Sequence, residues 1–220
     1  MAMQKSKGNM YKFVSHTWNC IKGKCPHDCK YCYMKVYPQG ALHFAESELR
    51  TNLGKDNFIF VGSSCDMFAN IIPKEWIIKT LEHCNRFDNK YLFQSKNPIR
   101  ILDMMKYLPK KCVIGTTIES NRHYKEMGDT PSPKSRALVM FTLKQYYETM
   151  ITIEPIMDFD VVELVNLIKI AKPTWVNIGA DSKNNSLPEP EKEKLLELIE
   201  GVSKVTEIKK KTNLERLLNA

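Results

Sequence analysis

The chain lacks any apolar run long enough to cross a membrane, and its 220 residues contain no internal repeat and no low-complexity segment. Residues 1–12 carry lysines but no apolar h-region, so we expect no signal peptide. The seven cysteines are an odd number, which argues against a disulfide framework. These absences predict a protein without a membrane span that works in a reducing cytoplasm.

The composition fits one globular domain over residues 1–220. Apolar residues make up 43% of the chain, enough for a substantial core. The formal net charge is +8, from 33 basic and 25 acidic residues, which favours anionic partners such as nucleotides or nucleic acid. Part of this charge lies in the lysine-rich stretch 204–211, which we expect to be solvated.

Three cysteines stand close together as C-x3-C-x2-C: Cys25, Cys29 and Cys32. Such a loop can bind three irons of a 4Fe–4S cube and leave the fourth iron open. Adding Cys20 gives four thiols in thirteen residues, so a tetrahedral zinc site is an alternative. Zinc sites usually use two separated C-x2-C pairs, whereas here only Cys29 and Cys32 form one. The spacing therefore favours an open iron–sulfur cluster.

Short β-rich runs alternate with helical patterns along the chain. The expected strands are residues 11–17, 58–62, 91–94, 112–118, 150–154 and 175–178. The expected helices are residues 44–52, 73–87, 98–107, 135–147, 161–171 and 190–202.

Six β–α units in this order imply a parallel sheet with right-handed crossovers. A complete eightfold barrel needs about 250 residues. The chain therefore predicts an α/β fold, a partial (β/α)6 TIM-like barrel. Chemistry in such folds lies beyond the carboxyl ends of the strands, which makes strand-end residues the candidate ligands.

A C-x3-C-x2-C loop after the first strand of such a barrel resembles the radical S-adenosylmethionine (SAM) superfamily. The resemblance covers roughly residues 11–202. It implies that the three cysteines bind a 4Fe–4S cluster and that the amine and carboxylate of SAM chelate the fourth iron. Reduction then cleaves SAM to methionine and a 5′-deoxyadenosyl radical. Tyr31 occupies the aromatic position of the family, next to adenine.

Three segments indicate a subgroup within this superfamily: Trp18-Asn19, residues 61–68, and Ile153-Glu154-Pro155. These segments look like a compact, phage-type group of radical SAM proteins, whose strand ends are similar to "VGSMSDLF" and "EP". Compact members of this kind include queuosine lyases, which release queuine from its nucleoside. A distant similarity to spore photoproduct lyase, a DNA repair enzyme, is the alternative.

The end of the second strand reads Gly-Ser-Ser-Cys-Asp, where the wider family often has Gly-Gly-Glu. Ser63 and Ser64 are therefore candidates to accept from the SAM amine. Asp66 is a candidate for the amine or the substrate, with a turn cap as its structural alternative. Cys65 is a candidate hydrogen donor to a substrate radical, although such a cysteine is more often a small buried hydrophobe.

The next strand ends supply further candidates. Gln94 and Lys96 end the third strand, and Lys96 is expected to pair with the SAM carboxylate or a substrate phosphate. Thr117 and Glu119 end the fourth strand, and Glu119 is expected to take ribose hydroxyls. An exposed lysine and a helix cap are the ordinary alternatives for Lys96 and Glu119.

The last two strands complete the predicted site. Glu154 is expected to face the barrel mouth and to contact SAM, substrate or a basic residue. Val176 and Ile178 are expected to flank the adenine, with core packing as the structural alternative, and Asn177 is a further candidate to bind the cofactor. A deazaguanine nucleoside would need a carboxylate to read its amidine edge, and the candidates are Asp66, Glu154, Asp158 and Asp181.

The leading hypothesis is a radical SAM enzyme, a lyase that acts on a modified nucleoside in queuine salvage. It would need a reductant such as flavodoxin or ferredoxin. The alternative substrate is DNA or RNA, and a polynucleotide binder should show a continuous basic face. A different class, a zinc-binding interaction module without catalysis, is the second alternative.

Overall fold

The computed structural model describes residues 3–219. Ten strands are present: β1 (Gln4–Lys5), β2 (His16–Trp18), β3 (Ile21–Lys22), β4 (His43–Phe44), β5 (Phe58–Val61), β6 (Lys90–Gln94), β7 (Cys112–Thr117), β8 (Glu148–Ile153), β9 (Trp175–Ile178) and β10 (Glu207–Lys210). The α-helices are α1 (Lys74–Asn85), α2 (Pro98–Asp103), α3 (Pro133–Leu143), α4 (Val161–Ala171), α5 (Lys192–Ser203) and α6 (Glu215–Leu218).

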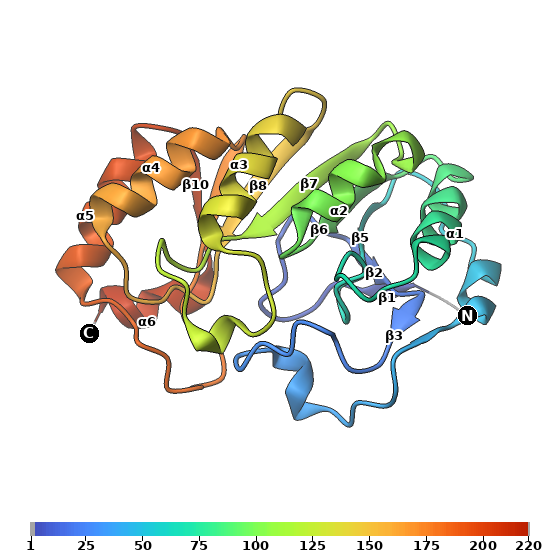
Figure 1. The fold of residues 1–220 in the computed structure, drawn as a ribbon, viewed down its shortest axis with the longest axis horizontal. Helices are drawn as coiled ribbons and strands as arrows, with labels where there is room; N and C mark the ends of the chain where they lie inside the picture. The colour runs from blue at the N-terminus through green and yellow to red at the C-terminus, as the bar shows by residue number, and fades with distance from the viewer. Residues whose placement is uncertain (1–2, 220) are drawn as a thin grey trace.

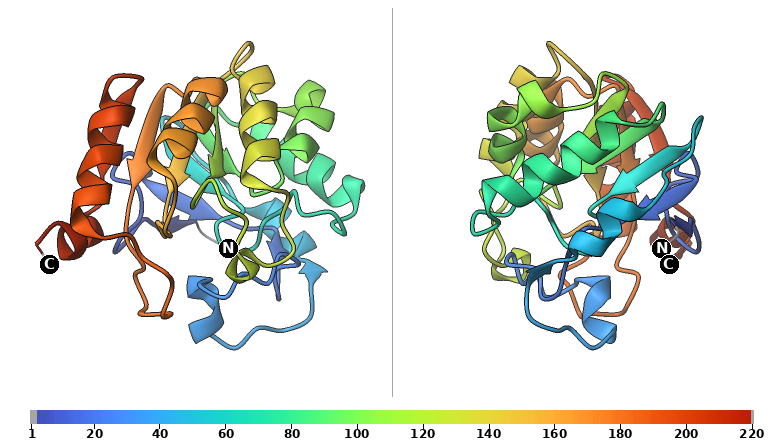
Figure 2. Two further views of the ribbon diagram at one scale, coloured as in Figure 1. Left: turned by 60° about the vertical axis from the view of Figure 1, so that its left-hand side comes forward. Right: turned by 90° about the vertical axis from the view of Figure 1, so that its right-hand side faces the viewer.

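A curved sheet runs in the order β1-β2-β5-β6-β7-β8-β9-β10. Neighbouring strands from β2 to β10 are parallel, and β1 adds an antiparallel edge. Figures 1 and 2 show the helices α1 to α5 arranged along one face of this sheet. The prediction of a partial TIM-like barrel is confirmed. The prediction of a single domain over residues 1–220 stays a prediction.

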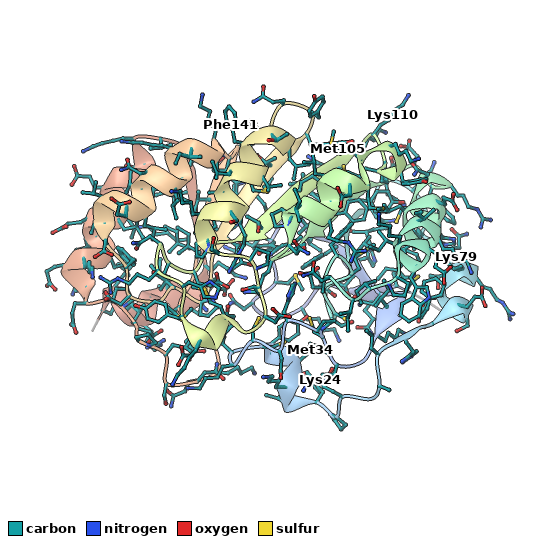
Figure 3. The ribbon with its side chains drawn as sticks, in the orientation of Figure 1. Lys24, Met34, Lys79, Met105, Lys110 and Phe141 are labelled. Carbon is teal, nitrogen blue, oxygen red and sulfur yellow. The ribbon has the colours of Figure 1, made fainter. Side chains whose placement is uncertain are left out.

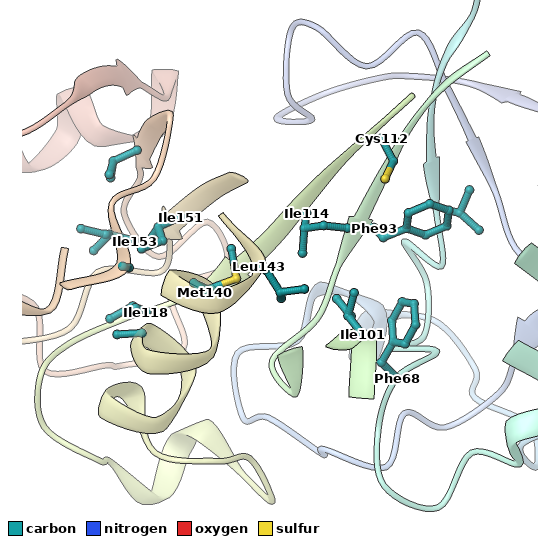
Figure 4. Packing of buried hydrophobic residues seen from close by; sticks show 14 of the residues in the cluster. Phe68, Phe93, Ile101, Cys112, Ile114, Ile118, Met140, Leu143, Ile151 and Ile153 are labelled. Carbon is teal, nitrogen blue, oxygen red and sulfur yellow. The ribbon is translucent and has the colours of Figure 1, made fainter. Parts of the chain in front are cut away.

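Alternate strand residues build two cores on the two faces of the sheet. The larger core lies between the sheet and the helices, as Figure 4 shows for Phe93 and Ile114 above Ile101 on α2 and Leu143 on α3. The smaller core lies on the other face of the sheet. There Tyr11 and Val14 of the N-terminal segment pack on four strand residues, Leu92, Val113, Met150 and Trp175. Residues 9–14 therefore fill the hollow of the open barrel.

This inner packing corrects the first expected strand, residues 11–17. The strand itself is β2, which begins five residues later than expected, at His16. Tyr11 and Val14 lie in a turn closed by a hydrogen bond from the Val14 amide to the Tyr11 carbonyl, 3.0 Å. Their spacing puts both side chains into the smaller core, so the apolar character that resembled a strand comes from a buried turn.

The expected helix over residues 44–52 is also wrong. Phe44 belongs to β4, which pairs with β3, and a 3₁₀ helix (Glu46–Arg50) follows. No side chain caps the start of this helix. The Glu48 side chain turns inward to Lys22, 2.6 Å away, so tertiary contacts rather than helix propensity shape the segment.

The sequence predicts that the lysine-rich stretch 204–211 is solvated, and the structure corrects this. Half of the stretch forms β10, which extends the sheet beyond β9. Lys209 lies over the rings of Trp175 and Phe13, at 4.1 and 5.6 Å. Long aliphatic stems explain how such a basic segment can pack. Within residues 3–219, no helix has the length and apolarity that a membrane span requires.

Candidate cluster and cofactor site

The cysteine loop follows β3 and is held by backbone contacts to a second loop, residues 125–129. The Lys30 amide donates to the Glu126 carbonyl and the Asp129 amide donates to the His27 carbonyl, both at 2.8 Å. Gly128 makes this approach feasible, because its φ is +69° and a Cβ there would lie 1.9 Å from the His27 carbonyl oxygen. The two loops therefore fix the backbone that carries the thiols.

The loop covers a cavity of about 880 Å³ beyond the carboxyl ends of the strands. All three cysteines of the motif line it, together with strand-end residues from β5, β6, β7 and β8. The predicted site residues in its wall are Cys25, Cys29, Tyr31, Cys32, Ser63, Ser64, Cys65, Asp66, Gln94, Lys96, Thr117 and Glu154. Most of the predicted site is thus brought to one place.

The three thiols are free and differ in acidity. A hydrogen bond from the Cys65 thiol lowers the pKa of Cys25 to about 6. Burial raises the pKa of Cys29 and of Cys32, and the charge of Lys96 opposes the rise in both. Because metal ions bind thiolates, Lys96 favours the form of these cysteines that a metal needs.

The arrangement of the thiols fits a cube. Within residues 3–219, no three His, Cys, Asp or Glu side chains surround a single point at which one metal ion would be bound. A 4Fe–4S cube takes each thiolate on a separate iron, so its cysteines need a shared cavity rather than a common point. Cys25, Cys29 and Cys32 have this cavity, and they lie near enough for their charges to interact.

Ser63 and Ser64 form a turn at the end of β5, and Asn19 fixes it. The Asn19 side chain accepts from the Ser64 amide at 3.0 Å and exchanges hydrogen bonds with the Ser63 hydroxyl at 3.3 Å. Tyr33, next to the last cysteine, donates to the Ser63 carbonyl at 2.6 Å. The turn and the cysteine loop are therefore linked directly. The contact of the serines with a SAM amine stays a prediction.

Asp66 is a structural link rather than a free ligand. Its carboxylate accepts from the Phe68 amide, the Lys96 amide, the Ser95 hydroxyl and the His27 ring, at 2.8 to 3.0 Å. Three of these donors reach Oδ2 and one reaches Oδ1. Asp66 is thus the turn cap that the sequence left as its alternative, and it also connects the cysteine loop to β6. Its contact with the SAM amine stays a prediction.

Lys96 is part of a buried charge network. Its ammonium group contacts the Glu119 carboxylate, donates to the Tyr31 hydroxyl at 2.8 Å and lies 4.6 Å from the Tyr31 ring centroid. Arg136 donates to the other Glu119 oxygen at 2.8 Å, and both of these side chains are fully buried. Two cations and one anion leave the network with a net positive charge, which Lys96 presents to the cavity.

The network overturns the role predicted for Glu119. Its carboxylate is 0% exposed and outside the cavity wall, so ribose hydroxyls do not reach it. Burial alone would raise its pKa, but the charges of Arg136 and Lys96 outweigh burial and hold the pKa well below the usual range. Arg136 was missed by sequence reasoning, because it lies on α3 and no local motif marks it.

Gln94 and Thr117 form the floor of the cavity with Tyr11. The Tyr11 hydroxyl donates to the Gln94 side chain at 2.9 Å and lies 2.7 Å from the Thr152 hydroxyl. The Gln94 amide in turn donates to Thr117 at 3.3 Å. Tyr11 was not predicted as a site residue, because its position looked like part of a strand.

Glu154 joins the two ends of the chain at the cavity wall. It pairs with Lys211 at 3.0 Å and accepts from the side chains of Asn9 and Asn213, at 2.7 and 3.1 Å. Lys211 also donates to the Asn9 carbonyl. The predicted contact with a basic residue is therefore present. The partners come from segments that the sequence analysis did not connect to the site.

Asn177 and Ile178 do not line the cavity. Ile178 packs in the core beneath the helices, and the buried Asn177 amide contacts the Met150 sulfur at 3.5 Å. Core packing accounts for both. Asp158 is paired with Arg122 and Lys194, each at 2.5 Å, and is also outside the cavity wall. Asp181 lines the cavity, where the side chain of Asn185 donates to it at 2.6 Å.

Comparisons with known proteins give the fold. No protein-family model matches the chain, and no curated protein matches its sequence. Ten solved chains match its structure. A tyrosine-to-phenylalanine mutant of spore photoproduct lyase has a TM-score of 0.60 at 12% identity, covering 93% of this chain and 66% of that one.

A second structure is a mutant of the same lyase with bound AdoMet and dinucleoside spore photoproduct. It has a TM-score of 0.58 at 11% identity, covering 91% of this chain and 64% of that one. The chain therefore spans about 64% of the length of that enzyme. At this identity the likeness shows a common fold, and the protein shares the partial-barrel fold of spore photoproduct lyase.

Proposed function

We propose that the protein is a radical SAM enzyme. The observation that carries the proposal is one cavity of about 880 Å³ whose wall contains the Cys25, Cys29 and Cys32 thiols together with the strand-end polar groups of a partial barrel. The volume is in the usual range for small-molecule sites. A spore photoproduct lyase structure of the same fold contains AdoMet, which supports the same cofactor here.

The chain's own residues have separable roles in this proposal. Cys25, Cys29 and Cys32 would hold a 4Fe–4S cluster that supplies the electron for reductive cleavage of SAM. Lys96, with one donor left after its contacts to Tyr31 and Glu119, would hold the SAM carboxylate. The Ser63–Ser64 turn would receive the amine, and the inner core beneath Tyr11 would exclude water from the far side.

The finer proposal concerns the substrate, a nucleoside unit. Tyr11 and Tyr33 line the cavity as flat surfaces, and polar groups from Asn9, Glu154 and Asn213 converge beside them. Such a wall suits a base and its sugar. Among the four carboxylates considered from the sequence, Glu154 and Asp181 both line the cavity, and each has an acceptor position left after its three donors.

Two substrates remain as proposals. A queuosine lyase would release queuine from a nucleoside held wholly in the cavity. A nucleic-acid enzyme would take one unit of a strand, and structures of spore photoproduct lyase with a dinucleoside lesion support this second candidate by fold. In either case Cys65, which lies against Cys25, is the proposed hydrogen donor near the cluster.

The test is anaerobic reconstitution of the purified chain with iron and sulfide. We expect iron and sulfide to bind, and 5′-deoxyadenosine to form when SAM and a strong reductant are added. Replacing Cys29 by alanine should abolish both results. The matched control is Cys112→Ala, because Cys112 is also buried but lies outside the cavity wall. Zinc without iron or sulfide would favour the interaction module instead.

A further inference from the structure

A second hollow, of about 510 Å³, lies beside the cavity and is lined by the N-terminal segment. Its basic residues are Lys5, Lys7, Lys12 and His16, and we call it the lysine groove. Among the residues that the structure describes, no aspartate or glutamate lines it. The groove is therefore electropositive, unlike the cavity, whose wall mixes acidic and basic side chains.

The lysines of the groove are exposed and have no acidic partner. Within residues 3–219, no ion pair involves Lys5, Lys7 or Lys12. Two lysines in the cavity wall do have acidic partners: Lys96 pairs with Glu119, and Lys211 with Glu154. The three ammonium groups of the groove are thus positive charges that no acidic side chain offsets.

The groove has an ordered frame. Lys5 on β1 lies opposite His16 on β2, and the Ser6 amide donates to the Ser15 carbonyl at 2.9 Å. Tyr11, buried in the inner core, fixes the turn that carries Lys12. The spacing of the lysines therefore follows from the fold and not from a free chain end.

The groove and the cavity are neighbours that share part of their lining. Lys7, Gly8, Met10 and Tyr11 line both of them. A molecule with its reacting unit at the strand ends would leave the cavity past Tyr11 and reach the lysines. Along this path the molecule would first meet the cysteine thiols, then the polar wall of the cavity, then the Tyr11 ring and finally the lysines of the groove.

We propose that the lysine groove binds the phosphodiester backbone of a nucleic acid strand whose target nucleoside enters the cavity. This inference rests on the proposed function and chooses between its two substrates, in favour of a strand over a free nucleoside. Unpaired lysines recognise phosphates as point charges, without reading sequence. An uncharged nucleoside in the cavity would leave the three ammonium groups without a role.

The groove makes a quantitative prediction about salt. Each phosphate neutralised on a single strand contributes about −0.7 to the slope of log affinity against log salt concentration. Three lysine–phosphate contacts therefore predict a slope of about −2, so that binding weakens roughly 20-fold when salt rises fourfold.

The experiment measures fluorescence anisotropy of a labelled single-stranded oligonucleotide of about ten residues with the anaerobically reconstituted protein. The variant replaces Lys5, Lys7 and Lys12 by glutamine. We expect its salt slope to fall close to zero, so that the variant no longer gains roughly 20-fold in affinity for the strand when salt is lowered fourfold. Formation of 5′-deoxyadenosine from SAM without oligonucleotide should stay unchanged in a variant that replaces Lys5 and Lys12 alone, because these two residues line the groove and not the cavity.

The matched control replaces three exposed lysines that lie away from both hollows, Lys110, Lys134 and Lys169, by glutamine. Figure 3 shows Lys110 at the opposite end of the molecule from Lys24 and Met34 of the cysteine region. Both triple variants lower the net charge equally, so a general charge effect would appear in both. We expect the control to keep the slope of the unmodified protein.

Several results would overturn the inference. Binding of guanosine as tightly as the oligonucleotide would do so, as would an unchanged salt slope in the groove variant. Equal binding of a nucleoside 5′-monophosphate would limit the groove to a terminal phosphate. Formation of 5′-deoxyadenosine without salt-dependent strand binding would refute this inference alone. Strand binding without 5′-deoxyadenosine would refute the proposed function and leave the groove in place.

Discussion

Replacing Glu119 by glutamine tests the buried charge network that orients Lys96. The carboxylate is fully buried and contacts Tyr31, Lys96 and Arg136. Removing one member of a buried ion pair costs about 3–5 kcal/mol, because the partner charge stays behind. Arg136 keeps two backbone carbonyl acceptors, of Thr117 and Pro131, so we expect the lower end, about 3 kcal/mol.

The assay is thermal and urea-induced unfolding at neutral pH. For a chain of this length, each 1 kcal/mol shifts the melting temperature by about 2–4 °C, so the variant should melt about 6–12 °C lower. Glu163→Gln is the control, since Glu163 is exposed on α4, and it should change the free energy of unfolding by less than about 0.5 kcal/mol.

The pH dependence gives a second readout. The pKa of Glu119 is held below its usual range in the folded protein, so its stabilising contribution is fully present above the ordinary carboxyl pKa of about 4.3. It is lost as the pH falls towards the lower folded pKa. The difference in free energy of unfolding between the unmodified protein and the Glu119→Gln variant should therefore become smaller below about pH 4. A variant as stable as the unmodified protein at neutral pH would refute the role of the network.

Three further changes test the site. Lys96→Met should weaken SAM binding at least tenfold in anaerobic equilibrium dialysis, as expected for a charge-assisted hydrogen bond, and Lys96→Arg should restore part of it. Gly128→Ala should lower the iron bound per chain, because its Cβ would collide with the cysteine loop, whereas Gly40→Ala, with open space around it, should not. Lys211→Met should speed amide exchange in the N-terminal turn about 5- to 30-fold, the effect of losing about 1–2 kcal/mol.

The sequence was most informative where local patterns and tertiary structure agree. The apolar runs of β5, β7 and β9 are strands in a buried parallel sheet, and α4 begins and ends where its periodicity predicts. The position of the cysteine loop at the carboxyl edge follows from that order of elements. These features depend on neighbouring residues in the chain, which a single sequence contains.

The errors lie where distant segments decide the structure. Nothing near Arg136 reveals that it will meet Glu119, and nothing near Lys211 reveals that it will meet Glu154 and Asn9. The lysine-rich β10 resembled a solvated surface, because its pairing with β9 is not local. Ligand roles were also assigned to strand-end carboxylates without knowing their hydrogen-bond partners.

The most direct measurement of the central claim is the content of iron and sulfide in the anaerobically reconstituted chain, followed by analysis of SAM products after reduction. The account predicts about four irons and four sulfides per chain and 5′-deoxyadenosine as a product. Zinc in place of iron would contradict it, and so would an intact cluster that yields no 5′-deoxyadenosine.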